Sequence, residues 1–252
     1  MDKQLIANKF SKSLESYNEE AIAQKQIVNH LFSLLNRNIK SKPKDILEFG
    51  SGTGLLSKKI VASFPNSHLY LNDLSEVFSN FLFSQFTKKE RNLLGFIVGD
   101  VENIEFPQKL DLIVSSSTEQ WIENKKAFYK KTYNALKQNG LFVFSTFGPE
   151  NLIQIRKASG KSLKYYTLKQ QQELFSDYFE LISSEESKID LNFSSGYEII
   201  SHLKKTGVNA LSKESWTKNK LKKLILDIEQ NTKSENGYTI SYHPMYFVLK
   251  KK

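Results

Sequence analysis

One short stretch contains residue types that suit the binding of a polar ligand. Residues 46–49 are apolar except for the carboxylate Glu48, and three alternating glycines follow them at Gly50, Gly52 and Gly54. This pattern predicts a buried strand, a tight turn and then a helix. Glycine suits a turn whose backbone presses against a ligand, because it has no Cβ and reaches positive φ without strain. We therefore predict that a ligand lies on this turn.

The spacing of the glycines separates two classes of nucleotide ligand. A dinucleotide fingerprint places its third glycine where this chain has Leu55, and it needs no acid before the first glycine. The pattern acid-x-Gly-x-Gly-x-Gly resembles the first motif of class I S-adenosylmethionine (SAM) methyltransferases, whose turn wraps the methionine end of the cofactor. Glu48 would then hold the ammonium group of SAM, directly or through water. The alternative is a helix-capping glycine turn beside a solvated carboxylate.

Two more acids follow predicted strands. Asp73 ends the second strand about 20 residues beyond the glycine turn, and Asp100 follows the third. Ligands of open α/β sheets bind outside the carboxyl ends of the strands. Asp73 is therefore placed to accept hydrogen bonds from both ribose hydroxyls, and Asp100 from the adenine amino group, with the backbone of Val101 reading the ring edge. The alternative for Asp73 is an ordinary Asx turn, and Gly99-Asp100 alone is a common turn pair.

The fourth predicted strand ends in an unusually polar segment, Ser-Ser-Ser-Thr-Glu-Gln-Trp over residues 115–121. We expect the three serines and the Gln120-Trp121 pair to face the space beside the transferable methyl group. Trp121 suits a substrate wall and a packed core position equally well. SAM brings its own leaving group, so transfer to an ionised carboxylate needs alignment more than acid-base help. The four histidines have no metal-ligand spacing, so no metal site is expected.

These residues need a sheet to position them, and the hydrophobic pattern predicts one. Short apolar strands alternate with helices from residue 43, which indicates βαβ units and a parallel sheet. We predict strands over 45–49, 68–71, 95–98, 110–114, 141–146, 180–187 and 238–249, and helices over 55–62, 125–136, 150–157, 168–178, 197–205 and 213–229. Ser75 is expected to N-cap another helix through Leu82, and Pro244 to mark an edge, a bulge or a break in the last strand.

The expected fold class is α/β, a Rossmann-like doubly wound, seven-stranded and mostly parallel sheet with helices on both faces. Apolar residues at helical spacing predict an N-terminal helical cap over 1–41. Helical insertions between the late strands are where an acceptor-binding lid would be built. We expect a single domain over 1–252, with a cofactor-binding half at 43–148 and acceptor-binding helices and last strands at 149–252.

Composition limits the class of protein. The chain has 252 residues and no cysteine, which excludes disulfides and thiolate metal sites and suits a reducing compartment. It has no 18-residue apolar run, and its polar start lacks the apolar core of a signal peptide, so a cytoplasmic protein is expected. The net charge of +9 permits an acidic partner, but the lysines are scattered, and the charge serves solubility equally well.

Several segments together resemble the malonyl-[acyl-carrier protein] O-methyltransferases of biotin synthesis, a family of class I SAM-dependent methyltransferases. The resemblance covers most of the chain. Its segments are Phe10 to Tyr17 with Ala21 and Gln24, Leu47 to Gly54, Gln120-Trp121, Ala135 to Leu141, Phe144 to Pro149 with Leu152, Gly207 to Ala210, and Tyr242 to Pro244. The glycine motif is shared by many methyltransferases, and the segments at 144–149, 207–210 and 242–244 are more discriminating.

The resemblance implies methylation of the free carboxyl of a malonyl thioester on an acyl-carrier protein. Carrier proteins are strongly acidic, so the positive charge would steer docking. Tyr17 would close over cofactor and acceptor, and Arg156 is the candidate for holding the acceptor carboxylate, because arginine binds carboxylates bidentately. Trp121, Phe147 and His243 are candidate substrate contacts. The full predicted cofactor site is Tyr17, Gln24, Glu48, Gly50, Ser51, Gly52, Gly54, Asn72, Asp73, Leu74, Asp100, Val101, Ser115, Ser116 and Gln120.

One departure from the family keeps other acceptors open. The family tends to show an Asn and apolar residues before Gln-Trp, where this chain has 115–119, and Glu119 beside an anionic substrate would be unfavourable unless it points away. The alternatives are another small carboxylate, a quinone precursor or a nucleic acid as acceptor, or a non-catalytic SAM-binding module. No N/D-P-P-Y/F-type motif follows the fourth strand and no aromatic-basic stripe is evident, which argues against nucleic acid.

Overall fold

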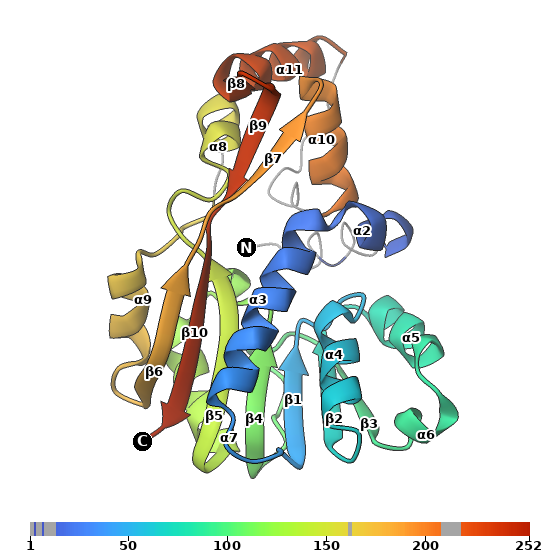
Figure 1. Ribbon diagram of the computed structural model, residues 1–252, viewed down its shortest axis with the longest axis vertical. Coiled ribbons are helices and arrows are strands. Elements are labelled where there is room, and N and C mark those ends of the chain that lie inside the picture. The colour runs from blue at the N-terminus through green and yellow to red at the C-terminus, as the bar shows by residue number, and fades with distance from the viewer. Residues whose placement is uncertain (1–2, 4–6, 8–13, 161–162, 208–217) are drawn as a thin grey trace.

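A computed structural model describes residues 3, 7, 14–160, 163–207 and 218–252 of the protein. Its centre is a seven-stranded sheet in the order β3-β2-β1-β4-β5-β10-β6 (Figure 1). Of these strands, β10 runs antiparallel to both of its neighbours, and the others run parallel to one another. The strands are β1 (Asp45–Phe49), β2 (His68–Asp73), β3 (Leu94–Val98), β4 (Leu110–Ser115), β5 (Leu136–Phe147), β6 (Phe179–Glu186) and β10 (Pro244–Lys251). This sheet confirms the predicted Rossmann-like fold class.

The strand order reverses direction at β1. The chain passes from β1 through β2 to β3 on one side, and it then continues with β4 and β5 on the other side. β1 therefore pairs with both β2 and β4. A reversal of this kind leaves a crevice outside the carboxyl ends of the strands, where α/β proteins bind their ligands.

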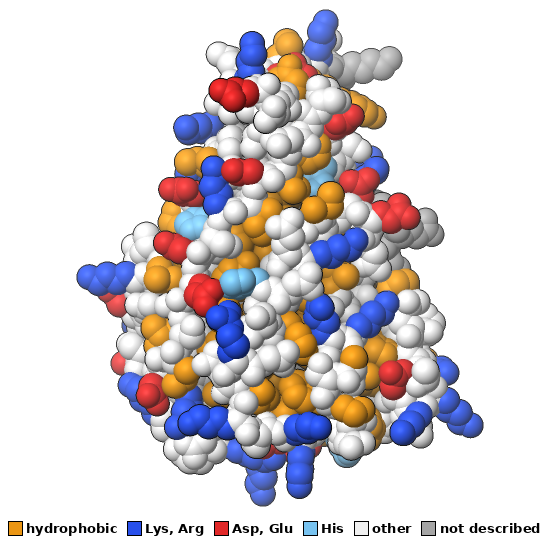
Figure 2. All heavy atoms as spheres, viewed as in Figure 1, with side chains coloured by type: hydrophobic (Ala, Val, Ile, Leu, Met, Phe, Trp, Pro, Cys, Tyr) orange, Lys and Arg blue, Asp and Glu red, His pale blue; other side chains and the backbone are white. Residues whose placement is uncertain are grey.

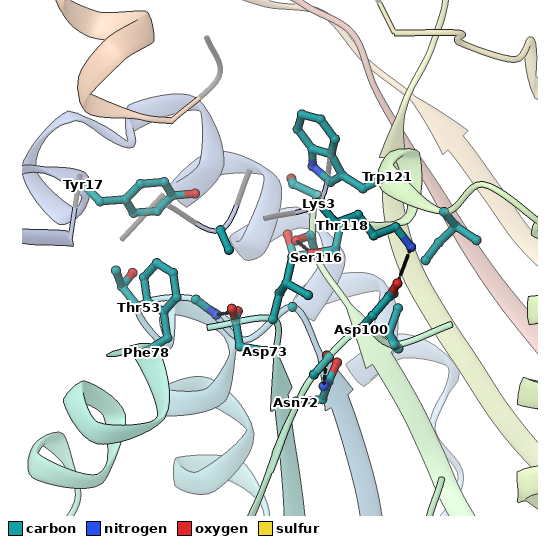
Figure 3. Close-up of a pocket in the computed structure, with 18 residues that line it drawn as sticks. Lys3, Tyr17, Thr53, Asn72, Asp73, Phe78, Asp100, Ser116, Thr118 and Trp121 are labelled. Carbon is teal, nitrogen blue, oxygen red and sulfur yellow. Dashed lines mark hydrogen bonds and ion pairs between the residues drawn. The ribbon is translucent and has the colours of Figure 1, made fainter. Parts of the chain in front are cut away.

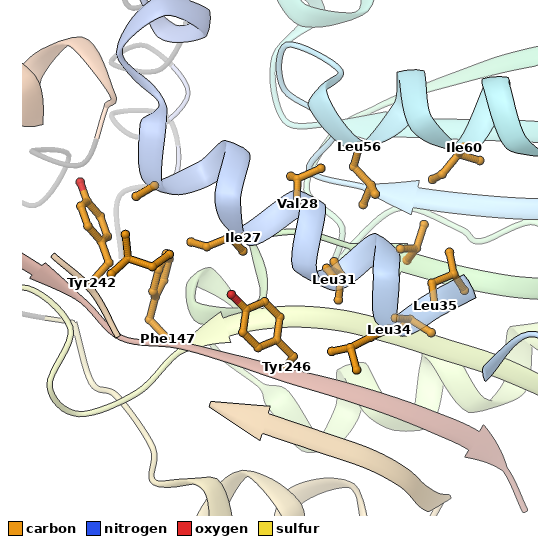
Figure 4. Packing of buried hydrophobic residues seen from close by; sticks show 14 of the residues in the cluster. Ile27, Val28, Leu31, Leu34, Leu35, Leu56, Ile60, Phe147, Tyr242 and Tyr246 are labelled. Atoms are coloured by element: carbon orange, nitrogen blue, oxygen red, sulfur yellow. The ribbon is translucent and has the colours of Figure 1, made fainter. Parts of the chain in front are cut away.

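Helices cover both faces of the sheet, because side chains in β1 alternate between two apolar clusters. Ile46 faces the cluster that contains Leu31 and Ile60, whereas Leu47 faces the cluster around Phe128. Figure 4 shows the contact between α3 and α4 in the first cluster. The first face is covered by α3 (Ile22–Asn38) and α4 (Leu55–Ser63). The second face is covered by α7 (Lys125–Ala135) and α9 (Leu168–Phe175). Two further helices, α5 (Glu76–Gln85) and α6 (Lys88–Arg91), lie beside β2 and β3.

A smaller lobe lies beyond the carboxyl ends of the strands, at the top of Figure 1. It contains a three-stranded sheet, β7-β9-β8, which the sequence pattern does not predict. Its helix α10 contacts α2 (Leu14–Glu20), so the lobe and the N-terminal helices meet above the crevice. The lobe comprises α8 (Ile153–Ser159), β7 (Ile189–Phe193), α10 (Gly196–Lys205), α11 (Lys218–Thr232), β8 (Lys233–Ser234) and β9 (Gly237–Tyr242).

The strand expected over 238–249 is two strands. β9 ends at Tyr242 in the small sheet, and β10 begins at Pro244 in the large one, so the interruption suggested by Pro244 is confirmed and a single continuous strand is wrong. The N-cap expected at Ser75 is also confirmed, since its hydroxyl accepts the Val77 N–H at 3.3 Å. Some predicted features lie outside the described residues: positions 10–13 and 208–210 of the segments that resemble the family, and the start of the predicted helix at 213–217.

None of the helices in the described ranges is long and apolar enough to cross a membrane.

Candidate active site

A pocket lies at the carboxyl ends of β1 to β4, beneath α2 (Figure 3). Parallel strands end at one edge of the sheet, so residues far apart in sequence converge there. The predicted site residues that line it are Tyr17, Gly50, Gly52, Asn72, Asp73, Leu74, Asp100, Val101, Ser116 and Trp121. The structure therefore brings together the glycine turn, the acids at the ends of β2 and β3, and part of the polar segment after β4.

The glycine turn has the positive φ angles that its sequence requires, +66° at Gly50 and +50° at Gly52. A Cβ on Gly50 would lie 2.1 Å from the Thr118 hydroxyl oxygen, so the turn packs closely against the segment that follows β4. A Cβ on Gly52 would meet no described atom within 4 Å, because this residue faces the pocket. The turn is fixed to β2 by a hydrogen bond from the Ser51 N–H to the Asn72 carbonyl at 3.0 Å.

Glu48 lies beneath the turn with 2% of its surface exposed. Its Oε2 is fully buried and has no hydrogen-bond partner among the described residues. Burial, with a smaller contribution from the charge of Asp73, raises the pKa of Glu48 to about 8. The empty site therefore favours the protonated carboxyl, and a cationic group bound near it would favour the ionised form.

Asp73 is shared between local bonds and the pocket. Its Oδ2 accepts the Gly52 N–H at 2.9 Å, and its Oδ1 accepts the Ser75 N–H at 3.1 Å. The Leu74 N–H is a third backbone donor to this carboxylate, so about one of its four acceptor positions remains for a ligand. Burial raises the pKa of Asp73 to about 6, although these backbone hydrogen bonds act in the opposite direction. Beside it, the Asn72 side chain donates to the carbonyls of Ile97 and Gly99 and so holds the end of β3.

Asp100 lies at the far end of the pocket and is paired with Lys3 (Figure 3). The Lys3 Nζ lies 2.9 Å from Oδ1 and 2.7 Å from Oδ2 of Asp100, and it also contacts Glu102. The Oδ1 atom accepts the Glu102 N–H at 3.0 Å as well. The acid predicted to meet the adenine amino group thus also organises its own turn.

The polar segment after β4 divides into structural and pocket-facing residues. Ser115 is fully buried and donates to the Phe49 carbonyl at 2.8 Å, which ties β4 to β1 rather than facing the pocket. Ser117 has a positive φ of 55°, and its N–H donates to the Ser145 hydroxyl at 3.0 Å. Gln120 donates to the Ser117 carbonyl at 2.6 Å. Buried Ser117 Oγ and Gln120 Oε1 have no partner within the described part of the chain.

Tyr17 lies across the pocket from Asp73, on the helix α2 (Figure 3). Burial, and then the charge of Asp73, raises the pKa of Tyr17 well above its usual value. The hydroxyl of Thr53 donates to the Asn18 Oδ1 at 2.7 Å, which joins the glycine turn to α2. Gln24, at the start of α3, is buried and its Oε1 has no described partner. These contacts close the N-terminal helices over the turn.

Three predicted acceptor residues lie outside the pocket lining. Arg156 is half-buried on α8, where its charge lowers the pKa of Tyr165 against the raising effect of burial. Phe147 packs in the core, with its ring 6.2 Å from that of Tyr242. His243 supports the turn after β5, because its Nδ1 accepts the Glu150 N–H at 3.2 Å and its Nε2 lies 3.4 Å from Glu186.

The pocket also contains residues that the sequence reasoning missed, namely Lys3, Ala7, Thr53, Phe78, Gly99, Thr118 and Ile122, whereas Ser117 was expected there with the other serines. Thr53 lies inside the glycine motif, and Thr118 continues the polar segment, so their positions in the sequence could have indicated them. Phe78 is in the first turn of the helix after Asp73, which is also a readable signal. Nothing in the sequence indicates Lys3, which reaches the pocket from far along the chain.

The pocket lining presents the glycine turn and two strand-end acids in a fixed order. Open space lies over Gly52 at the turn. The predicted cofactor residues Glu48 and Gln120 do not line the pocket, although each has a buried oxygen with no partner among the described residues. Asp73 is in the middle, and Asp100 with Val101 lies at the other end.

Comparison with known proteins agrees with this geometry. The family described as "Methyltransferase domain" matches residues 47–142. A malonyl-[acyl-carrier protein] O-methyltransferase of Bacteroides thetaiotaomicron is 35% identical over 100% of this chain and 99% of that protein. The chain belongs to this O-methyltransferase family. A Bacteroides fragilis member is also 35% identical over 99% of this chain, although the chain spans only 51% of that longer protein.

Solved structures agree on the fold of this family member. An N-methyltransferase of Haemonchus contortus, solved with S-adenosylhomocysteine (SAH), is similar over 89% of this chain and 52% of that chain, with a TM-score of 0.57 and 18% identity. The fold is therefore that of the class I SAM-dependent methyltransferases.

Proposed function

We propose that the protein transfers the methyl group of SAM to the free carboxyl of a malonyl thioester on an acyl-carrier protein, an early step of biotin synthesis. The observation that carries the proposal is the pocket that joins a glycine turn to Asp73 and Asp100, with Glu48 buried beneath the turn. The chain is also 35% identical over its full length to a protein named for that reaction. As in the sequence analysis, we propose that residues 1–252 act as one domain in the cytoplasm.

The cofactor would be held at three positions. Glu48 and Gln120 accept the ammonium group, since each has a buried oxygen with no partner among the described residues, although neither lines the pocket. Asp73 accepts from the ribose with the acceptor capacity that its backbone hydrogen bonds leave. Asp100 accepts the adenine amino group. Bound SAM supplies a methyl group on a positively charged sulfur, which is transferred to one carboxylate oxygen as the sulfur takes the electron pair of the broken bond.

The chain's own residues supply alignment and exclusion of water. A malonyl carboxylate is already ionised at neutral pH, so no general base is required. Tyr17 covers the pocket from α2 and keeps its proton, because burial and Asp73 raise its pKa. We propose that Arg156 holds the acceptor from α8, where it lies near Tyr165, with Trp121 as a wall.

The carrier protein would approach a positively charged molecule. On the face shown in Figure 2, Lys and Arg side chains are scattered among Asp and Glu. The net charge of +9 favours encounter with an acidic partner over long range. Such steering weakens with salt, so the association rate is expected to fall as ionic strength rises.

The test is transfer of labelled methyl from SAM to purified malonyl-acyl-carrier protein, with free malonate and bulk RNA as parallel acceptors. Release of methanol by base identifies an ester. We expect base-labile label on the malonyl carrier alone, reduced in Tyr17→Phe and Arg156→Ala. Lys157→Ala is the matched control, because Lys157 is the exposed neighbour of Arg156 on α8. Label on malonate or RNA instead, or none despite SAH binding, would contradict the proposal.

A further inference from the structure

A buried ion pair lies directly behind the pocket wall. The Glu119 Oε1 and the Lys125 Nζ are 2.5 Å apart, and their side chains are 1% and 6% exposed. Glu119 opens the short helix η1 (Glu119–Trp121), and Lys125 opens α7. The carboxylate therefore points away from the pocket into the protein, which answers the concern that it would repel an anionic substrate.

Two more buried side chains complete this cluster. The Tyr129 hydroxyl and the Gln171 Nε2 both donate to the Glu119 Oε1, each at 2.7 Å. The Lys125 Nζ also donates to the Glu119 carbonyl at 2.8 Å, so both side chain and backbone of Glu119 are held. Tyr129 is on α7 and Gln171 is on α9, and their exposed fractions are only 0% and 1%. The cluster thus joins η1 to two helices of the second face of the sheet.

Such a pair is not needed for stability alone. Two charges lose their hydration when buried, and well-packed apolar residues of similar volume usually give equal or greater stability. A charged, hydrogen-bonded cluster differs from an apolar contact in that it accepts only one geometry. What it fixes here is η1, whose last residue Trp121 lines the pocket together with Ile122.

The other end of the same segment is fixed independently. Thr118 packs against Gly50, and Ser117 is held in a positive-φ conformation by Ser145. The wall from Ser116 to Ile122 is therefore held between the glycine turn and the buried cluster.

We propose that Glu119 and Lys125 are positioning residues that set where Trp121 lies against the acceptor. The acceptor's identity rests on the proposed function, whereas the placement of Trp121 does not. Neither residue touches the pocket, and both act through η1.

The test removes both charges and keeps the side-chain volumes, in the double variant Glu119→Gln/Lys125→Met. All proteins carry Trp216→Phe, so that Trp121 is the single tryptophan of the chain. Acrylamide quenching of Trp121 fluorescence reports how well η1 is held, SAH affinity reports the intact cofactor site, and acceptor kcat/KM reports function. We expect the quenching constant to rise at least twofold and kcat/KM to fall at least tenfold, with SAH affinity changed less than threefold.

A matched control uses an ion pair far from the pocket. Asp111→Asn/Lys137→Met removes a pair of 2.8 Å at the opposite end of β4, and should leave quenching and kinetics unchanged. If the first double variant does not fold, Tyr129→Phe removes one donor to Glu119 without changing charge, and should move quenching in the same direction by less. Unchanged quenching in the folded variants, or equal effects in the control, would overturn the proposal. Because quenching needs no acceptor, failure of the proposed substrate would be recognised separately.

Discussion

The Oδ2 of Asp73 accepts the backbone N–H of Gly52 at 2.9 Å, so the end of β2 is bonded to the ligand turn that follows β1. The acid predicted for ribose binding and the glycine predicted for close backbone approach thus form one unit. A ligand that binds the Asp73 carboxylate therefore also stabilises the glycine turn, and the ordered turn in turn holds this carboxylate in position for the ligand.

Asp73→Asn is expected to weaken SAH binding, because the amide loses acceptor positions and places a donor against a backbone N–H. A hydrogen bond to a charged group contributes about 1.5–3 kcal/mol, so the affinity should fall roughly 10- to 100-fold. Calorimetric titration with SAH measures this. Asp111→Asn is the control, since Asp111 also accepts two backbone N–H groups but lies at the other end of the sheet. Equal losses in both variants would refute a ligand role for Asp73.

Gly52→Ala should prevent cofactor binding, and Gly160→Ala should not. Both glycines have positive φ, +50° and +68°, and a Cβ on either would meet no described atom within 4 Å. The backbone strain in the two variants is therefore similar, about 1–3 kcal/mol. Only the Gly52 methyl would enter the pocket, so SAH affinity separates the variants while their thermal midpoints fall together. Normal affinity in Gly52→Ala would place the cofactor elsewhere.

The raised pKa of Glu48 makes cofactor affinity depend on pH. Glu48 is protonated in the empty site below about pH 8 and must ionise to bind an ammonium group. SAH affinity should therefore rise by up to about tenfold per pH unit between pH 6 and 7.5. Titration in buffers of different ionisation enthalpy should detect proton release. Glu48→Gln should flatten the pH profile and abolish the release, whereas an unchanged profile would exclude Glu48 as the ammonium partner.

The same carboxyl links folding to pH in the ligand-free protein. A pKa raised from 4.5 to about 8 means that the folded state holds its proton more tightly than the unfolded state. This contribution to stability is complete below about pH 4.5 and is lost as pH rises through about 8. Urea unfolding from pH 5 to 8 should show a decline that is smaller in Glu48→Gln. A decline of equal size in that variant would assign it to other groups.

The contact of α3 with the sheet should carry much of the stability of the N-terminal region. Leu31 is fully buried in the first apolar cluster, so Leu31→Ala should lower the free energy of unfolding by about 2–5 kcal/mol. Ile22→Ala, on the same helix, should change it by less than about 0.5 kcal/mol, since Ile22 is 49% exposed. Denaturant titration compares the two, and similar values would mean that α3 does not pack as described.

The first half of the fold was predictable because its signals are local. The strands β1 to β4 are short apolar runs, and residues at or just after their ends, such as Asp73 and Asp100, reach the site by following their strands. The late strands depend on distant partners instead. In residues 238–249, Pro244 gave a local signal for a break, but not for two separate sheets, because these depend on β9 pairing with β7 and β10 with β5.

The limits were similar at the site. Ser115 belongs to a polar run that pointed to the pocket, but its hydroxyl satisfies the Phe49 carbonyl, which only the pairing of β4 with β1 reveals. Glu119 looked unfavourable in the sequence because only the packing of η1 against α7 and α9 brings it to Lys125, 6 positions away, and to Gln171, 52 positions away. Sequence spacing identified the glycine turn and the acids. The conformation of the pocket wall from Ser116 to Ile122 depends on tertiary contacts that the sequence does not show.

The place of β10 has a consequence for how the chain is made. In the sheet, β6 is attached through β10, which pairs with β5 on its other side. While a ribosome is still producing residues 244–251, β5 is left with an open edge and β6 has no partner in that sheet. Open edges of this kind invite pairing with other chains. The edge of β5 therefore stays exposed to such pairing until β10 inserts between β5 and β6.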